Sequence, residues 1–346
     1  VQAATIVLVD ARTMPLFALL FAYGIGQLYA RQHAKGVSDA DARRLLRRRH
    51  LWMVVFGAVH AALLWQGDIL ATYGILGLIM VPLFISRRPR TLAIWAGALT
   101  GAVALLAALG PLAASMGPDP APDQGDAAQA DIQHASIGES FYPLAAVVRL
   151  ASWLMGTASG VLSLVLPAAV LLGLLAAKHR VLEEPGRHLR LLRVTAAAGL
   201  LLGWSGAVPH ALMHLGVIGD AGAATFTSLH FFSGLFAGAG YAALFGLLAQ
   251  RVERAGRRNA LPVRAIGALG RRSLTGYLAQ SVIYAPLLTA WGLGAGTHFS
   301  SGSAALLAVG VWTVTVIGAY LLERHARRGP AETLLRRLTY PKAPSR

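Results

Sequence analysis

His60 and Asp68 stand inside a run that otherwise has the composition of a membrane helix, HAALLWQGDILATYG at residues 60–74. A histidine can shuttle a proton near neutral pH, and a carboxylate can fix which ring nitrogen carries that proton. The eight-residue spacing leaves both side chains on broadly the same side of the chain, either in contact or apart. The pair is therefore either a proton-transferring site or a packing histidine beside a helix-capping aspartate.

A second set of polar residues lies in GALGRRSLTGYLAQSVIY, residues 267–284. Its polar side chains recur every three to four residues, which predicts one stripe along a membrane helix; the stripe consists of Ser273, Tyr277 and Gln280 or Ser281. Such a stripe either joins helices by hydrogen bonds or faces a ligand. Arg271 and Arg272 precede it, and they either bind phosphates or anchor the helix end.

A third group is expected near the outer ends of other spans, and it consists of Asp10, Arg12, His210, His214 and His230. The tripeptide DAR at 10–12 is either a local ion pair or a clamp for an anionic group. His210 and His214 have the i, i+4 spacing of a metal pair, but no glutamate or further motif accompanies them, so no metal is expected.

The composition places these residues in a membrane protein. Of the 346 residues, 55% are hydrophobic and only 13% are charged, about half the charged share of a soluble domain. Apolar windows predict an all-α, polytopic helical bundle with about nine spans, in one transmembrane domain over residues 1–346. The expected spans are 13–30, 51–66, 69–86, 91–115, 157–177, 194–213, 225–249, 273–293 and 304–322. Residues 140–156 are expected to form an interfacial or re-entrant helix, because Arg149 interrupts them.

The distribution of positive charge predicts the orientation. Five connections carry 29 of the 31 Lys and Arg residues, and they are 31–49, 87–90, 178–193, 251–272 and 324–346. The alternate connections carry none, so the positive-inside rule predicts a multi-pass protein of a bacterial inner membrane with a cytoplasmic basic tail, 324–346. The acidic loop 116–140 is then extracytoplasmic, and one further helix is expected before residue 1.

The net charge of +16 is accordingly explained by topology and by contact with anionic lipids, not by nucleic acid. The chain has no cysteine, which excludes disulfides, thiolate nucleophiles and cysteine metal sites.

Four stretches resemble the YeiB-type family of bacterial membrane proteins, a domain of unknown function. They are DARTMPLFALLFAYGIG (10–26), RRRHLWMVVFGAVHAALLWQGDILATYGILGLI (47–79), GALGRRSLTGYLAQSVIY (267–284) and RGPAETLLRRLTY (328–340). LLGLLAAKHRVLE (171–183) is more weakly similar. The family in turn resembles the transmembrane acyltransferase superfamily, which uses a membrane-embedded histidine.

The resemblance implies transfer of an acyl group from cytoplasmic acyl-CoA to a small-molecule or lipid-like acceptor at the outer face. His60 would then be the catalytic base, with Asp68 orienting it. CoA phosphates would contact cytoplasmic arginines, for which the candidates are Arg47, Arg48, Arg271 and Arg272. The candidates for contacting substrate or oxyanion are Arg12, Tyr277, Gln280 and Ser281.

Two other functions remain open from the residues. Intramembrane His and Asp could couple protons to a transporter or flippase, although no inverted repeat is visible. The chain could instead capture a membrane-active ligand, as a binding or immunity protein. A homodimer is one candidate assembly, and the lipid bilayer is the expected surrounding partner.

Overall fold

The computed structural model describes residues 1–116, 135–219 and 222–340, and in this part all regular elements are helices, with no strand. The all-α prediction is therefore confirmed. Residues 117–134 of the expected outer loop and 341–346 of the tail lie outside the described residues. The chain divides into two compact units, and the expected single domain stays a prediction. Unit 1 comprises Val1–Leu46, Leu76–Ala121 and Gly160–Arg254; unit 2 comprises Arg47–Ile75, Pro122–Ser159 and Ala255–Arg346.

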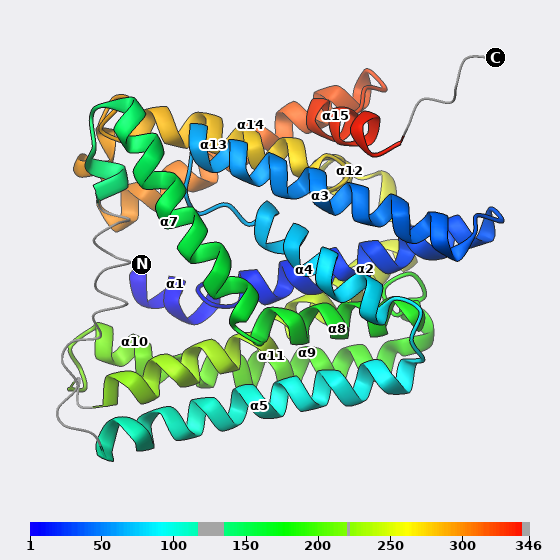
Figure 1. Cartoon of the computed structure of the whole chain (residues 1–346), viewed down its shortest axis with the longest axis horizontal. Coiled ribbons are helices and arrows are strands. Elements are labelled where there is room, and N and C mark those ends of the chain that lie inside the picture. The colour runs from blue at the N-terminus through cyan, green and yellow to red at the C-terminus, as the bar shows by residue number, and fades with distance from the viewer. Residues whose placement is uncertain (117–134, 220–221, 341–346) are drawn as a thin grey trace. The chain divides into compact units, whose positions relative to one another are not determined.

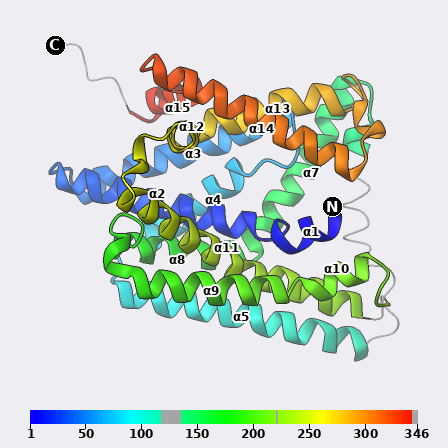
Figure 2. The ribbon, with the colours of Figure 1, turned by 180° about the vertical axis from the view of Figure 1, so that it is seen from behind.

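Unit 1 is built on long helices that run side by side. Its complete helices are α1 (Gln2–Leu8), α2 (Thr13–Ala34), α5 (Pro89–Met116), α8 (Val165–Lys178), α9 (Leu189–Ser205), α10 (Val208–His214) and α11 (Ala223–Arg254). The most extensive contacts join α11 to α9 and α2 to α8. Figures 1 and 2 show α5, α9 and α11 as neighbouring rods from both sides.

Glycines allow these helices to approach closely. A Cβ at Gly203 of α9 would overlap Ala237 of α11, and a Cβ at Gly173 of α8 would overlap the Leu19 carbonyl of α2. Lipid tails are as apolar as leucine, so membrane helices associate through tight packing of small residues and not through burial alone. The glycine-rich composition thus contributes to helix contacts in unit 1.

Unit 2 contains the second part of α3 (Asp39–Leu63) and the start of α4 (Leu70–Phe84), which both continue into unit 1. It also contains most of α7 (Tyr142–Leu162) and all of α12 (Leu261–Arg271), α13 (Ser273–Leu288), α14 (Ser301–Arg324) and α15 (Pro330–Thr339). α14 packs against α12 and α13, and α15 packs against α13. Both α12 and α15 are short and amphipathic.

Within the described ranges, six helical segments are long and apolar enough to cross a membrane. They are Gln2–Ala34, Pro89–Leu109, Tyr142–Leu162, Pro185–His214, Ala223–Arg254 and Ser301–Arg324. Two shorter apolar helices are α4 and α8. The described chain is therefore that of a multi-pass membrane protein, while the expected count of nine spans is not reached by this measure and stays a prediction.

The expected continuous span at 157–177 is wrong. α7 ends at Leu162 and α8 begins at Val165, with Leu164 between them at a left-handed φ of 55°. The expected interfacial helix 140–156 instead belongs to α7, whose 21 residues are enough to cross a membrane. An apolar window does not detect the break because it averages hydropathy, although Pro167 in the first turn of α8 is a local signal of a helix start.

Candidate functional site

His60 and Asp68 meet. His60 lies in the last turn of α3, and Asp68 lies in the turn that leads into α4. The His60 Nδ1 and Asp68 Oδ1 atoms are 3.0 Å apart, and the two side chains are 1% and 0% exposed. The contact that the sequence left open is therefore present, and it is shielded from solvent.

Two further hydrogen bonds fix the carboxylate, and a third orients the tyrosine that makes one of them. Asp68 Oδ2 accepts from the Ala71 backbone N–H at 2.9 Å, which caps the first turn of α4. The Tyr277 hydroxyl donates to Asp68 Oδ1 at 3.3 Å and accepts from the Ile69 N–H at 3.3 Å. Gly57 makes room for this arrangement, because a Cβ there would overlap Asp68 Oδ2. α3, α4 and α13 thus hold one carboxylate together.

This arrangement determines the tautomer of His60. A carboxylate only accepts hydrogen bonds, so Nδ1 carries the proton that lies between His60 and Asp68. In the neutral ring Nε2 is then a free acceptor. Nε2 is buried and has no hydrogen-bond partner among the described residues. Unsatisfied buried polar atoms are rare in folded proteins, so this nitrogen is the atom of the pair available for chemistry.

Arg149 of α7 belongs to the same unit, and sequence reasoning missed it as a site residue. Its side chain donates from Nε to the Ala61 carbonyl at 3.3 Å and from Nη2 to the Ala62 carbonyl at 2.8 Å. These carbonyls belong to the last turn of α3, where a helix has unsatisfied acceptors and a negative dipole end. Arg149 is 1% exposed, and its Nη1 has no partner within the described chain.

Aromatic rings enclose the Arg149 guanidinium. Its central carbon lies 5.0 Å from the centre of the Tyr142 ring and 5.6 Å from that of Trp291, both within cation–π range. Tyr142 also donates to the Leu63 carbonyl at 2.8 Å. The signal in the sequence was the lone arginine of an apolar run, which was interpreted only as an interruption of a span.

The rest of the α13 stripe lies apart from the His60–Asp68 pair. The Gln280 amide donates to the Thr315 hydroxyl of α14 at 3.5 Å, and Ser281 is buried on the same helix. No hydrogen bond joins either residue to His60 or Asp68 in the part of the chain that is described. Of the stripe, only Tyr277 reaches the His60–Asp68 pair.

Arg271 and Arg272 do come together, but around a carboxylate of the protein. Arg271 Nη2 and Arg272 Nη1 lie 2.5 Å and 2.8 Å from the two oxygens of Glu323. Arg272 is buried and also donates to the Ala268 and Arg327 carbonyls. Arg47 and Arg48, by contrast, are exposed on α3.

Arg12 lies in unit 1, in a cluster separate from the residues described above. It is 0% exposed, and it donates from Nη2 to the Gly203 carbonyl at 2.8 Å and from Nη1 to the Asp10 carbonyl at 2.5 Å. Nη1 also lies 2.9 Å from His230 Nδ1, whose ring stacks on that of His210. Within the described residues, the Arg12 and Asp10 side chains of the DAR tripeptide form no ion pair, because Arg12 donates to the backbone carbonyl of Asp10 instead.

The comparisons with known proteins support a family but no activity. Residues 176–342 match the family described as "Protein of unknown function (DUF418)". The uncharacterized protein YxaH of Bacillus subtilis (strain 168) is 26% identical over 351 residues, covering 96% of this chain and 80% of YxaH. The uncharacterized protein YeiB of Escherichia coli (strain K12) is 27% identical over 341 residues, covering 95% of this chain and 82% of YeiB. No solved structure matches the chain at a significant level.

Proposed function

We propose that this chain, a member of the YeiB-type family, transfers an acyl group from acyl-CoA to an acceptor within the membrane. The observation that carries the proposal is the His60–Asp68 pair with its open Nε2. A carboxylate on Nδ1 and a free Nε2 make up the arrangement by which a histidine acts as general base in acyl transfer.

In the proposed step, His60 Nε2 takes the proton of an acceptor hydroxyl or amine as that oxygen or nitrogen attacks the thioester carbonyl carbon. The C–S bond of the thioester then breaks, and the CoA sulfur leaves with the proton that His60 returns. Asp68 holds the ring in the required tautomer and stabilises the imidazolium that forms transiently. The acceptor ends as an ester or amide, and CoA ends as the free thiol.

Tyr277 has a positioning role in this proposal. Its hydroxyl already donates to Asp68 and accepts from Ile69, so it orients the carboxylate and is not a free donor. Arg149 is the better candidate to stabilise developing negative charge, since its Nη1 is a buried cationic donor without a partner in the described chain. For the CoA phosphates, Arg47 and Arg48 are exposed, whereas Arg271 and Arg272 share Glu323.

The proposal includes the orientation that the charge pattern predicts. The basic connections and the C-terminal tail lie on the cytoplasmic side of a bacterial inner membrane, where acyl-CoA is present. The turn 64–69 between α3 and α4 then lies toward the outer side, so that the donor must reach His60 from within the protein.

The absence of cysteine makes the test direct, because any thiol detected in a reaction is released CoA. Purified protein in lipid nanodiscs is given acetyl-CoA or octanoyl-CoA together with glucosamine, glycerol or phosphatidylethanolamine, and thiol release is followed with a chromogenic disulfide. We expect His60→Ala to lose on the order of 100-fold or more in rate, and Asp68→Asn to lose a similar factor. His33→Ala, an exposed histidine, is the control and keeps the wild-type rate.

Equal rates in the wild type and the His60→Ala variant would refute the assignment of His60. No thiol release with any donor and acceptor would count against acyl transfer altogether.

A proton-coupled transporter is the second candidate, favoured by interrupted helices. The chain breaks between α7 and α8 at Leu164 and between α9 and α10 at Gly206. Broken helices are typical of transporter binding sites, and the buried Arg12–His230 contact supplies a titratable group in unit 1. Proton-dependent uptake of a solute into liposomes without acyl-CoA, lost in His230→Ala, would favour this function over acyl transfer.

A further inference from the structure

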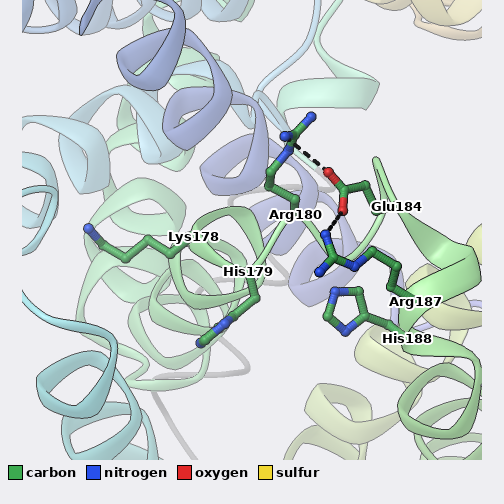
Figure 3. Close-up of a pocket in the computed structure, with 6 residues that line it drawn as sticks. All are labelled: Lys178, His179, Arg180, Glu184, Arg187 and His188. Atoms are coloured by element: carbon green, nitrogen blue, oxygen red, sulfur yellow. Dashed lines mark hydrogen bonds and ion pairs between the residues drawn. The ribbon is translucent and has the colours of Figure 1, made fainter. Parts of the chain in front are cut away.

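Unit 1 contains a basic pocket that none of the roles considered above uses. It has a volume of about 460 Å³ and lies where α8 ends and the short helix η1 (Pro185–His188) begins. Its lining residues are Lys178, His179, Arg180, Glu184, Arg187 and His188. Figure 3 shows the Arg180 and Arg187 guanidinium groups directed at the same carboxylate, with the His188 ring beside Arg187.

The backbone of this pocket is fixed from beneath by Tyr23 of α2. The Tyr23 hydroxyl accepts from the Leu182 and Glu183 N–H groups at 3.0 and 3.1 Å. It also donates to the Glu183 side chain at 3.2 Å. Tyr23 is 5% exposed, so the connection is held by a buried anchor and the pocket does not depend on a free loop.

Arg180 occupies a position that normally takes glycine. It has a φ of 54°, and the N–H groups of Arg180 and Val181 bond back to Ala177 and Ala176, which closes α8 with the left-handed turn typical of helix ends. A side chain in this conformation is disfavoured, and such strain concentrates at functional positions. The turn directs the Arg180 guanidinium toward Glu184.

Two arginines hold the two oxygens of one carboxylate. Arg180 Nη1 lies 3.0 Å from Glu184 Oε1, and Arg187 Nη1 lies 2.8 Å from Glu184 Oε2. Lys178 adds a third cation to the lining and has no ion-pair partner within the described residues. The lining therefore has a net positive charge. Its two guanidinium groups each contact one oxygen of the same carboxylate, as they would contact two oxygens of one bound anion.

We propose that this pocket binds a phosphate group, either of a soluble phosphorylated molecule or of a lipid headgroup. Arg180 and Arg187 bind the phosphate oxygens that Glu184 now mimics, and His188, whose ring lies beside Arg187 in Figure 3, adds a further donor. Arginine matches phosphate geometry with paired N–H groups, and a pocket of about 460 Å³ admits more than the phosphate itself. The inference does not rest on acyl transfer, since the pocket lies in unit 1 and His60 in unit 2.

The test uses the full chain in detergent, with pyrophosphate as the soluble probe in titration calorimetry. Native mass spectrometry supplies the second arm, comparing retention of phosphatidylglycerol with that of phosphatidylcholine. We expect Arg187→Gln and Arg180→Gln to weaken binding of the probe about tenfold or more. Glu184→Gln should instead strengthen it, because the competing carboxylate is gone. Arg193→Gln, an exposed arginine in the second turn of α9 and outside the lining, is the matched control.

Binding of pyrophosphate assigns a soluble ligand, and retention of phosphatidylglycerol alone assigns a lipid; either result supports the site if Arg187→Gln removes it. If Arg187→Gln and Arg193→Gln weaken binding equally, the pocket is refuted, and only nonspecific attraction to the basic face remains. No binding in either arm would refute it as well. A midpoint of thermal unfolding equal to that of the wild type shows that each variant is folded.

Discussion

The contact between His60 and Asp68 can be measured as a free energy without knowledge of any substrate. In a double-mutant cycle, His60→Ala, Asp68→Ala and the double variant are unfolded reversibly with SDS in mixed micelles, and the fluorescence of the seven tryptophans is recorded. The coupling is the difference between the double change and the sum of the single changes in free energy of unfolding.

The geometry sets the expected size of each effect. Asp68→Ala removes the cap on Ala71, which is worth about 1 kcal/mol, and leaves the buried His60 Nδ1–H without an acceptor, which costs about 1–3 kcal/mol. The cap term occurs in both the single and the double variant, so it cancels in the cycle. The coupling then reports the buried hydrogen bond to a charged group, and we expect about 1.5–3 kcal/mol.

The chain offers a matched control pair. His33 and Asp39 also form a His–Asp contact, at 3.5 Å, but their side chains are 41% and 35% exposed. Solvent screening limits such a pair to roughly 0.2–1 kcal/mol, so its cycle should give a clearly smaller coupling. If His60 and Asp68 prove additive within about 0.5 kcal/mol, or couple no more strongly than the control pair, the reasoning about a shielded dyad is refuted.

Four further changes test other parts of the structure. Gly234→Ala places a Cβ against a backbone carbonyl before α2 and should lower the free energy of unfolding by about 1–3 kcal/mol. The new methyl group of Gly97→Ala in α5 meets nothing within 4 Å, so this change should raise the free energy of unfolding by up to about 1 kcal/mol. Equal SDS midpoints for the Gly234→Ala and Gly97→Ala variants would contradict the packing of unit 1. Arg149→Gln removes the buried cation between two rings and the end of α3, and a loss of about 2–4 kcal/mol is expected, measured by the same unfolding. The hydrogen bond from Arg187, and then the nearby positive charges, lower the pKa of the Glu184 carboxyl below its ordinary value of 4.5. The ionised Glu184 carboxylate thus stabilises the fold above pH 4.5, and this stabilisation is lost as the pH falls. The difference in free energy of unfolding between wild type and Glu184→Gln should therefore be constant above about pH 5 and vanish in stronger acid. A difference that grows in acid would contradict this.

The sequence predicted the class of the protein better than the course of its helices. The thickness and apolar nature of the bilayer impose a composition and a length of apolar run on the sequence, and these features predict an all-α membrane protein. The break at Leu164 has a local marker, because Pro167 lies in the first turn of α8, but a hydropathy window averages over it. Similarly, Arg271 and Arg272 could not be assigned partners, because Glu323 lies about fifty residues further on.

The candidate site was predicted in its residue types but not in its contacts. The cost of placing His60 and Asp68 in an apolar run identified both residues, whereas their contact depends on the rotation of α3 and on space left by Gly57. Tyr277 was one of several polar residues on a helix, and only the packing of α13 selects it over Gln280.

Two positive charges depart from the distribution that sets the topology. Only Arg12 and Arg149 fall outside the five basic connections, and these two have the largest side chains among those that the described structure buries almost completely, at 0% and 1% exposure. Within the described residues, neutral acceptors hold both, carbonyls with a histidine for Arg12 and carbonyls with aromatic rings for Arg149. A cation that neither anchors a helix end in the interface nor pairs with a carboxylate has no role in topology, and burying it is costly. An exception to the positive-inside pattern is therefore a criterion, applicable to sequence alone, for locating the buried polar centres of such a protein.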